Sequence, residues 1–366
     1  MAQGPALVVR FSSLGDVLLA AHVPGFLRMA RPGRRVLFVT KERYGDILRG
    51  HPDVDRFYRL EDRTSDPAAP SPLGVVGSLG DLGAALRREG VEEVFDLQQN
   101  IRSSRLIASL RDVKTTSPPK HPLRRRMMVY ARWLRPKPLP PLLQTYREMA
   151  GLPSDAPLRP WLRLALSDNE RKRAHPPEGA RPFALLSVGA RWATKRWPAA
   201  SFVELARRME AELGLDARFA IGPDEAALAE ELRALLSSER RGAIVTAGFR
   251  ELAALASYAA AIVSNDSAVL HLGPALGVPA LGIFGSTVPG FGFAYQGPHD
   301  AVAEIELGCR PCDVHGKNRC PLGHHRCMKN LTPEIAFRAL RGMLESSGEA
   351  RREGQAGARP AEIAPR

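Results

Sequence analysis

Short apolar runs alternate with amphipathic segments along the first half of the chain. Residues 6–9 form an apolar run, and after a polar turn apolar residues recur at helical spacing from Val17 to Leu27. Further strands are predicted at 36–39, 56–60 and 93–97, with a helix near 81–88. Strands that alternate with helices form parallel sheets, so residues 1–165 are predicted to form one Rossmann-like domain.

The same alternation restarts near residue 182. Strands are predicted at 183–188, 217–221, 243–246, 260–263 and 280–284, with helices over 201–213, 225–236, 249–259 and 268–276. This second domain is predicted to span 182–332, followed by a helix over 333–345. Residues 346–366 are polar and rich in Gly and Ala, which predicts a disordered tail. The pattern as a whole predicts an α/β protein of two Rossmann-like domains that face each other across a cleft.

A polar turn follows the first predicted strand. Ser12, Ser13 and Gly15 come directly before or at the start of the helix, and Asp16 lies in its first turn. In open α/β sheets ligands bind beyond the carboxyl ends of strands, so these residues are candidates for contact with a substrate. The alternative is local: the serines cap the helix, and the helix dipole favours an acid in its first turn.

A second polar strand end follows residues 93–97. Asn100, Arg102 and Ser103 lie there and are candidates for binding substrate hydroxyls or phosphates. Helix capping is an equally good explanation of Ser103.

The second domain contains two groups suited to a nucleotide diphosphate. The first is a loop with Lys195 as a point charge and with Arg191 and Thr194 nearby. The second follows the predicted strand 260–263 and opens a helix whose N–H groups suit phosphates; it comprises Asp266, Ser267, Ala268 and His271. Taken singly, each residue also has a structural explanation, such as a cap, a hydrogen-bonded core histidine or a surface lysine.

Charge is concentrated in one region of the chain. The net charge is +13, which suits an acidic partner such as a nucleic acid, an anionic membrane or a phosphorylated substrate. Residues 101–140 hold a single acid, Asp112, and eleven basic residues: Arg102, Arg105, Arg111, Lys114, Lys120, Arg124, Arg125, Arg126, Arg132, Arg135 and Lys137. Apolar and aromatic residues interleave with them. This pattern is typical of a basic amphipathic helix on a membrane or facing an anionic ligand, or of a solvated helix face.

The four cysteines all fall in one segment, residues 309–327. Their spacing, C-x2-C-x7-C-x6-C, allows a structural zinc site of Cys309, Cys312, Cys320 and Cys327, or free thiols. We expect no signal peptide and no membrane span, and therefore a cytoplasmic protein with reduced thiols. Neither a dinucleotide-binding glycine motif nor a Walker loop is found, which argues against nicotinamide redox and P-loop chemistry.

Four motifs in order along the chain resemble one known family. They are Arg10-Phe11-Ser12-Ser13-Leu14-Gly15-Asp16, the loop Lys195-Arg196-Trp197-Pro198, Asn265-Asp266-Ser267-Ala268-x-x-His271, and Phe284-Gly285-Ser286-Thr287-x-Pro289. Together they resemble the family 9 glycosyltransferases, the heptosyltransferases of lipopolysaccharide core assembly. The cysteine segment is similar to the heptosyltransferase II branch of that family.

The resemblance implies a GT-B fold, with the acceptor on the first domain and ADP-heptose on the second. It implies transfer that inverts the anomeric centre without a catalytic metal, Asp16 as general base and Lys195 as phosphate ligand. The turn Asp266–His271 matches the donor site, and Glu225 matches an acid that binds the nucleotide or heptose. The implied reaction adds the second heptose to a lipid A–Kdo–heptose acceptor, at the cytoplasmic face of the inner membrane.

Two other functions are compatible with parts of the sequence. Another family 9 transferase, adding the first or third heptose or another sugar, shares the four motifs. A non-catalytic anion-binding protein explains the charge alone, but the aromatic-plus-basic strands of RNA readers are not found, so no nucleic-acid partner is expected.

Overall fold

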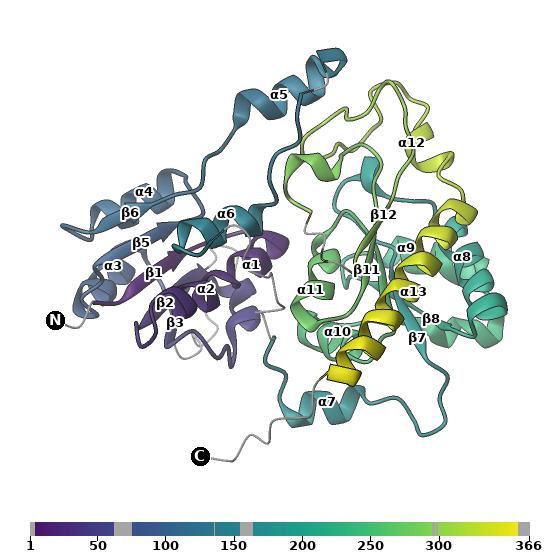
Figure 1. Ribbon diagram of the computed structural model, residues 1–366, viewed down its shortest axis with the longest axis horizontal. Coiled ribbons are helices and arrows are strands. Elements are labelled where there is room, and N and C mark those ends of the chain that lie inside the picture. The colour runs from purple at the N-terminus through teal and green to yellow at the C-terminus, as the bar shows by residue number, and fades with distance from the viewer. Residues whose placement is uncertain are drawn as a thin grey trace.

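The computed structural model describes residues 4–61, 75–134, 136–153, 164–294, 297 and 299–357, and it shows two α/β domains side by side (Figure 1). The first domain has a six-stranded parallel sheet in the order β4-β3-β2-β1-β5-β6. Its strands are β1 Ala6–Val9, β2 Val36–Lys41, β3 Arg56–Leu60, β4 Val75–Val76, β5 Glu93–Asp96 and β6 Lys114–Thr116. Its helices are α1 Leu14–Ala20, α2 Val23–Ala30, η1 Glu42–Leu48, α3 Leu79–Arg88, α4 Ile101–Ala108, α5 Pro122–Tyr130, η2 Arg132–Leu134 and α6 Leu142–Met149.

The second domain has a parallel sheet of the same size in the order β12-β11-β10-β7-β8-β9. Its strands are β7 Phe183–Ser187, β8 Asp216–Ile221, β9 Ile244–Thr246, β10 Ala261–Asn265, β11 Ala280–Ile283 and β12 Ala301–Ala303. Its helices are η3 Ala193–Lys195, α8 Ala199–Leu213, α9 Ala226–Leu235, η4 Ser238–Ala243, α10 Phe249–Ala256, η5 Ala268–His271, α11 Leu272–Leu276, η6 Pro289–Phe291 and α12 Arg326–Lys329. Helix α7 Asp168–Ala174 lies between the two domains in sequence, and α13 Pro333–Gly357 follows the second.

The central strands of both sheets are covered on both faces, which explains their continuous apolar runs. Every residue of β1 and of β10 is buried. In the first sheet β1 pairs with β5 so that Val9 lies beside Asp96. This register places the turn after β1 beside the turn after β5, at the carboxyl edge of the sheet.

Two helical predictions differ from the structure. The helical pattern from Val17 to Leu27 is interrupted, because Pro24 lacks the N–H that would continue α1 and instead occupies the first turn of α2. The C-terminal helix was expected to end at residue 345, but α13 continues to Gly357. The backbone of 346–357 is therefore helical where a disordered tail was predicted, and residues 358–366 lie outside the described part of the chain.

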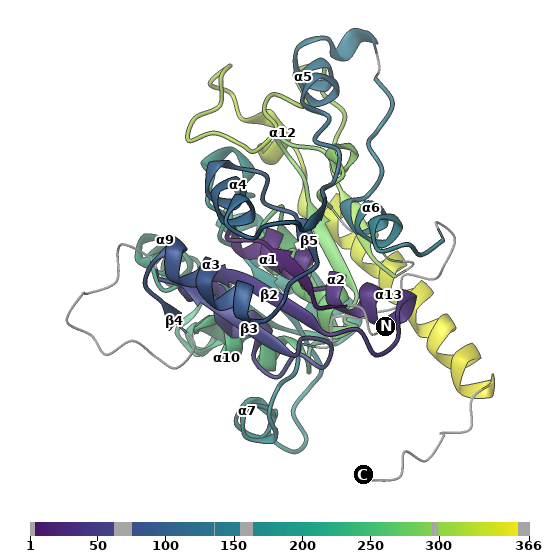
Figure 2. The same cartoon turned by 90° about the vertical axis from the view of Figure 1, so that its left-hand side faces the viewer.

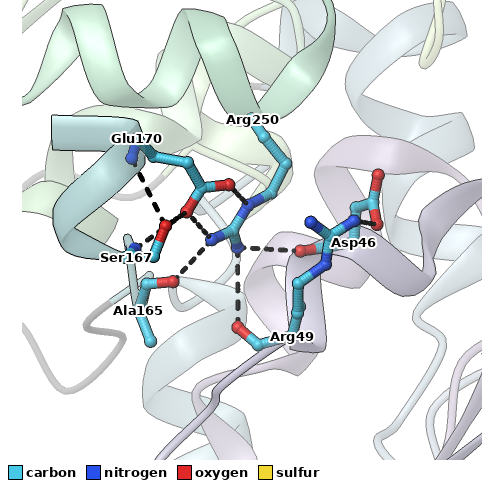
Figure 3. A network of polar contacts seen from close by, with 6 residues as sticks. All are labelled: Asp46, Arg49, Ala165, Ser167, Glu170 and Arg250. Atoms are coloured by element: carbon cyan, nitrogen blue, oxygen red, sulfur yellow. Dashed lines mark hydrogen bonds and ion pairs between the residues drawn. The ribbon is translucent and has the colours of Figure 1, made fainter. Parts of the chain in front are cut away.

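A buried arginine ties the two domains together (Figure 3). Arg250 of α10 donates from Nε and Nη2 to the Glu170 carboxylate of α7, at 2.7 and 2.6 Å. Its Nη1 donates to the carbonyl of Asp46 in η1 at 3.1 Å, and Nη2 donates to the carbonyl of Ala165 at 2.7 Å. One side chain thus joins the first domain, the second domain and the segment between them.

None of the helices in the described ranges combines the length and the apolar character that crossing a membrane requires.

Candidate active site

Asp16 lies where the first domain faces the second, held by its own turn. The N–H and the Oγ of Ser13 donate to Asp16 Oδ2 at 3.0 and 2.7 Å, and Arg10 Nη2 forms an ion pair with the same oxygen at 2.8 Å. Within the described residues Oδ1 has no hydrogen-bond partner, and the side chain is 27% exposed. Asp16 therefore both caps α1, as the local explanation holds, and presents a free carboxylate oxygen.

Opposing effects set the charge of Asp16. Burial raises the pKa of its carboxyl, but the Arg10 guanidinium and the hydrogen bonds from Ser13 outweigh burial and hold the pKa below the ordinary value of 3.8. Asp16 is thus a carboxylate at neutral pH. Arg10 is fixed in turn, because its Nε donates to the Ser12 carbonyl at 2.7 Å and its Nη1 to the Leu97 carbonyl.

The second domain presents a lysine and an aspartate in contact. Lys195 Nζ lies 2.6 Å from Asp266 Oδ2, and Thr287 Oγ1 donates to the same oxygen at 2.7 Å. Asn265, directly before Asp266, accepts from the N–H of Trp197 at 3.0 Å, which joins the Lys195 loop to the end of β10. The Lys195 loop and the turn after β10, which were both predicted to bind a nucleotide diphosphate, are therefore in direct contact.

His271 lies between these groups and Asp16. A Cβ built on Gly15 would be 2.9 Å from His271 Cδ2, so α1 and η5 touch across the domain boundary. Burial lowers the pKa of His271, the charges of Asp266 and Asp16 raise it, and Lys195 lowers it, with a net decrease. His271 is thus neutral at pH 7, and its buried Nδ1 has no hydrogen-bond partner in the described part of the chain.

Three other residues predicted to bind the donor, Glu225, Ser267 and Ala268, lie beyond the ends of strands of the second domain. Glu225 accepts from the N–H of Gly222 at 3.0 Å and lies against Gly189, the glycine that follows β7. Ser267 and Ala268 begin η5 as expected, and Ser267 Oγ is 3.1 Å from Ser264 Oγ.

Two of the predicted donor ligands have other partners. Thr194 is buried, and its Oγ1 accepts from Ser286 Oγ at 3.0 Å and from the N–H of Lys317 at 2.8 Å. Arg191 is exposed and lies over the ring of Trp192 at 5.2 Å.

Of the residues predicted to bind the acceptor, some are held in hydrogen bonds within the first domain and one lies over an aromatic ring. Asn100 caps α4 by accepting from the N–H of Ser103 at 3.0 Å, so the capping explanation holds for both side chains. Arg102 is exposed and lies 5.9 Å from the centre of the Phe11 ring. Ser12 donates its N–H to Gln98 Oε1 at 3.2 Å, which joins the turn after β1 to the turn after β5.

A cleft of about 660 Å³ opens beside Asp16 and is lined from both domains. The walls include cations, aromatic rings and the Asp16 carboxylate; among them are Arg10, Asp16, Lys120, Arg125, Arg126, Tyr130, Tyr146, Phe293 and His315. From the sequence, no role at this cleft was predicted for Arg10, Tyr146 or His315. The basic residues 120–126 were noticed for their charge, but their place at this cleft depends on a long-range contact that no local pattern encodes.

None of the four cysteines forms a disulfide bond, and Cys327 is buried. Burial, with the neighbouring thiols, raises the pKa of Cys312 and raises that of Cys327 to about 11. Among the described residues no three or more His, Cys, Asp or Glu side chains are grouped so as to hold a metal ion. A structural zinc ion therefore stays a prediction.

Comparison with known proteins identifies the family of this chain. Residues 79–322 match the family model "Glycosyltransferase family 9 (heptosyltransferase)". Lipopolysaccharide heptosyltransferase 2 of Salmonella typhimurium is 24% identical over 360 residues, which cover 93% of this chain and 99% of that protein. Lipooligosaccharide heptosyltransferase 2 of Campylobacter jejuni is 26% identical over 166 residues, 44% of this chain, and the match spans about half (51%) of that protein's length.

Solved structures share the arrangement of the two domains. ADP-heptose lipopolysaccharide heptosyltransferase II of Escherichia coli superposes with a TM-score of 0.68 at 19% identity, covering 94% of this chain and 99% of that one. A family 9 glycosyltransferase of Veillonella parvula gives a TM-score of 0.71 at 19% identity, covering 94% and 98%. The predicted GT-B fold is therefore confirmed. The chain belongs to glycosyltransferase family 9, the heptosyltransferase family, and is a glycosyltransferase.

Proposed function

We propose that this enzyme transfers a heptose from ADP-L-glycero-D-manno-heptose to heptosyl-Kdo2-lipid A, adding the second heptose of the lipopolysaccharide inner core. The support for this step is the match to a heptosyltransferase 2 over nearly its full length. The observation that carries the proposal is that Asp16 on the first domain and the Lys195–Asp266 ion pair on the second both lie near His271. A base on one domain and a cation on the other are what group transfer between two bound substrates requires.

Asp16 acts as the general base. An acceptor hydroxyl is a weak nucleophile until its proton is removed, and a positioned carboxylate contributes roughly 10²–10⁴-fold to such a step. Oδ2 is held by Arg10 and Ser13, so the unpartnered Oδ1 receives the proton. The hydroxyl oxygen attacks the anomeric carbon, the bond from that carbon to the diphosphate breaks, and the configuration inverts.

Lys195 stabilises the departing ADP. The bond that breaks leaves negative charge on the diphosphate, and a fixed ammonium group stabilises that charge in place of a metal ion. Lys195 is held by Asp266, which is held in turn by Thr287. Nδ1 of the neutral His271, which has no hydrogen-bond partner among the described residues, can form a hydrogen bond with a hydroxyl or phosphate oxygen of the donor.

Acceptors truncated at successive sugars test the assignment. The enzyme is incubated with ADP-heptose and with Kdo2-lipid A, heptosyl-Kdo2-lipid A or diheptosyl-Kdo2-lipid A, and the products are weighed by mass spectrometry. We expect one added heptose on heptosyl-Kdo2-lipid A alone. Addition to Kdo2-lipid A or to the diheptosyl acceptor would instead assign the first or third heptose, and salt-sensitive anion binding without transfer would leave the non-catalytic alternative.

The cysteine segment carries a separate proposal, a structural zinc ion bound by its four thiolates. The support for this proposal is the spacing of the four cysteines, in which the C-x2-C pair is typical of a zinc half-site. Elemental analysis of enzyme purified without chelator tests this. A zinc content near one per chain supports the site, and a content near zero means that the thiols are free.

A further inference from the structure

The segment between β6 and α6, residues 117–141 and here called the arm, is one of the parts of the first domain that contact the second. It contains α5 and η2, and α5 stands at the extremity of the molecule in both views (Figures 1 and 2). Its sequence has seven Lys or Arg residues and no acid. Arg135 lies outside the described residues, and nothing below depends on it.

The inner side of the arm is anchored to the second domain. Met128 and Val129 are buried against Phe291 of η6. The N–H of Leu139 donates to the carbonyl of Gly290 at 2.9 Å, and the Arg125 guanidinium lies 4.5 Å from the centre of the Phe293 ring. These contacts fix the orientation of α5, so its two sides have different surroundings.

The outer side exposes large apolar side chains. Leu123, Tyr130, Trp133 and Leu134 are 72%, 69%, 74% and 60% exposed. They are four of the eight large hydrophobic residues that are exposed in the described part of the chain, and all fall within twelve residues. Single exposed apolar residues are ordinary on soluble proteins, but a cluster of this size marks a surface that has a partner.

The charge of the arm identifies the class of partner. Arg126 and Lys137 are exposed on the same segment, and Arg124 joins its two limbs by donating to the carbonyls of Lys137 and Pro138 at 2.9 and 3.1 Å. Aromatic and leucine side chains surrounded by Lys and Arg are the composition that binds the interface of an anionic bilayer. A second protein with an acidic groove would require a long apolar channel to cover the same residues, whereas a bilayer accepts them without a matching shape.

We propose that the arm docks the enzyme on an anionic lipid bilayer, with Trp133, Leu134 and Leu123 inserted at the interface and Tyr130 at the rim of the cleft. The arm also lines the cleft beside Asp16 through Lys120, Arg125 and Arg126. Docking by its outer side therefore places the mouth of the cleft at the membrane surface. On the proposed function, the sugars of a lipid-anchored acceptor then reach Asp16 while its acyl chains stay in the bilayer.

Co-sedimentation with vesicles tests the docking independently of catalysis. The full chain is mixed with vesicles of phosphatidylglycerol and phosphatidylethanolamine, or of phosphatidylcholine alone. The double variant Trp133→Ser/Leu134→Ser is compared with Leu235→Ser, an exposed leucine of α9 in the second domain. We expect binding to the anionic vesicles only, with partitioning reduced at least about tenfold by the double variant and unchanged by the control.

Two further measurements separate the possible outcomes. The melting temperature of the double variant should equal that of the unmodified chain, because Trp133 and Leu134 are 74% and 60% exposed. The proposal would be overturned if the unmodified enzyme did not bind anionic vesicles, or if the double variant bound them as well as the unmodified enzyme does. An arm-dependent dimer in sedimentation equilibrium, without lipid binding, would overturn it in favour of self-association.

Activity with two forms of acceptor distinguishes docking from the proposed reaction. The double variant should retain transfer to a deacylated, water-soluble acceptor and lose transfer to the same acceptor embedded in vesicles. If the unmodified enzyme transfers to neither acceptor, the proposed reaction fails while the vesicle result still decides the docking. If the double variant lost the same fraction of its transfer activity on both acceptors, the arm would contribute only to the cleft, and the docking proposal would be wrong.

Discussion

The Arg250 network predicts a measurable loss of stability when its guanidinium is removed. In an Arg250→Met variant the Glu170 carboxylate loses its bidentate partner, and the carbonyls of Asp46 and Ala165 each lose a donor. The side chains of Arg250 and Glu170 are only 9% and 11% exposed, so water replaces these contacts poorly. Breaking one side of a buried ion pair costs roughly 3–5 kcal/mol, and the residual exposure favours the lower end, about 3 kcal/mol.

Urea unfolding at pH 7 measures this loss, and Arg49→Met is the matched control. Arg49 lies in the same region and pairs with Asp46, but that pair is largely exposed and is worth about 0–1 kcal/mol (Figure 3). A loss below about 1 kcal/mol for Arg250→Met, or an equal loss for both variants, would refute the reasoning.

The pH dependence of stability gives an independent check on the same contact. The hydrogen bonds from Arg250 come first among the causes that hold the pKa of Glu170 well below its usual range. A carboxyl with a depressed pKa stabilises the folded state fully above its unfolded pKa, about 4.3, and loses that contribution as the pH falls further. The stability difference between the unmodified enzyme and a Glu170→Gln variant should therefore be constant near pH 7 and shrink below about pH 4.5. A difference that stays constant down to pH 3 would contradict this.

Two further predictions concern the catalytic centre. Lys195→Met should weaken ADP binding roughly 10- to 100-fold in calorimetry, because a charge-assisted contact to the diphosphate is lost, and unchanged affinity would exclude Lys195 as a phosphate ligand. Gly15→Ala should lower kcat at least about tenfold without weakening ADP binding, because the new Cβ would lie 2.9 Å from His271 and shift Asp16 away from the donor. The matched control is Gly342→Ala in α13, where a Cβ meets nothing within 4 Å, and equal activity of the two variants would show that the contact does not matter.

Nine of the twelve strands in the described residues, and the residues at their carboxyl ends, were predictable because their signals are local, whereas the short edge strands β4, β6 and β12 were not predicted. A continuous apolar run such as β1 identifies a doubly covered strand, and small polar residues after it identify a turn. The proximity of Lys195 to Asp266 followed from the resemblance of both motifs to one family. The capping explanation offered for Ser103 agrees with the capping box that it forms with Asn100, whereas the role of Asn100 as the N-cap was not predicted.

Contacts between distant segments could not be predicted in this way. The partners of Arg250 come from two separate segments, and each partner atom in Asp46 and Ala165 is a backbone carbonyl with no sequence signature. Lys120, Arg125 and Arg126 line the cleft because Met128 and Val129 pack on Phe291, more than 160 residues further along the chain. Such contacts depend on how the domains meet, which neither periodicity nor composition specifies.

A single comparison tests the central claim that Asp16 is the base for transfer from a donor held by the other domain. The rate of heptose transfer in one turnover is measured for the unmodified enzyme and for Asp16→Asn, together with ADP-heptose affinity in the same preparations. We predict that Asp16→Asn transfers heptose roughly 10²–10⁴-fold more slowly with unchanged affinity for the donor, since the substitution leaves Lys195 and Asp266 in place. Transfer by Asp16→Asn within about threefold of the unmodified enzyme would contradict it.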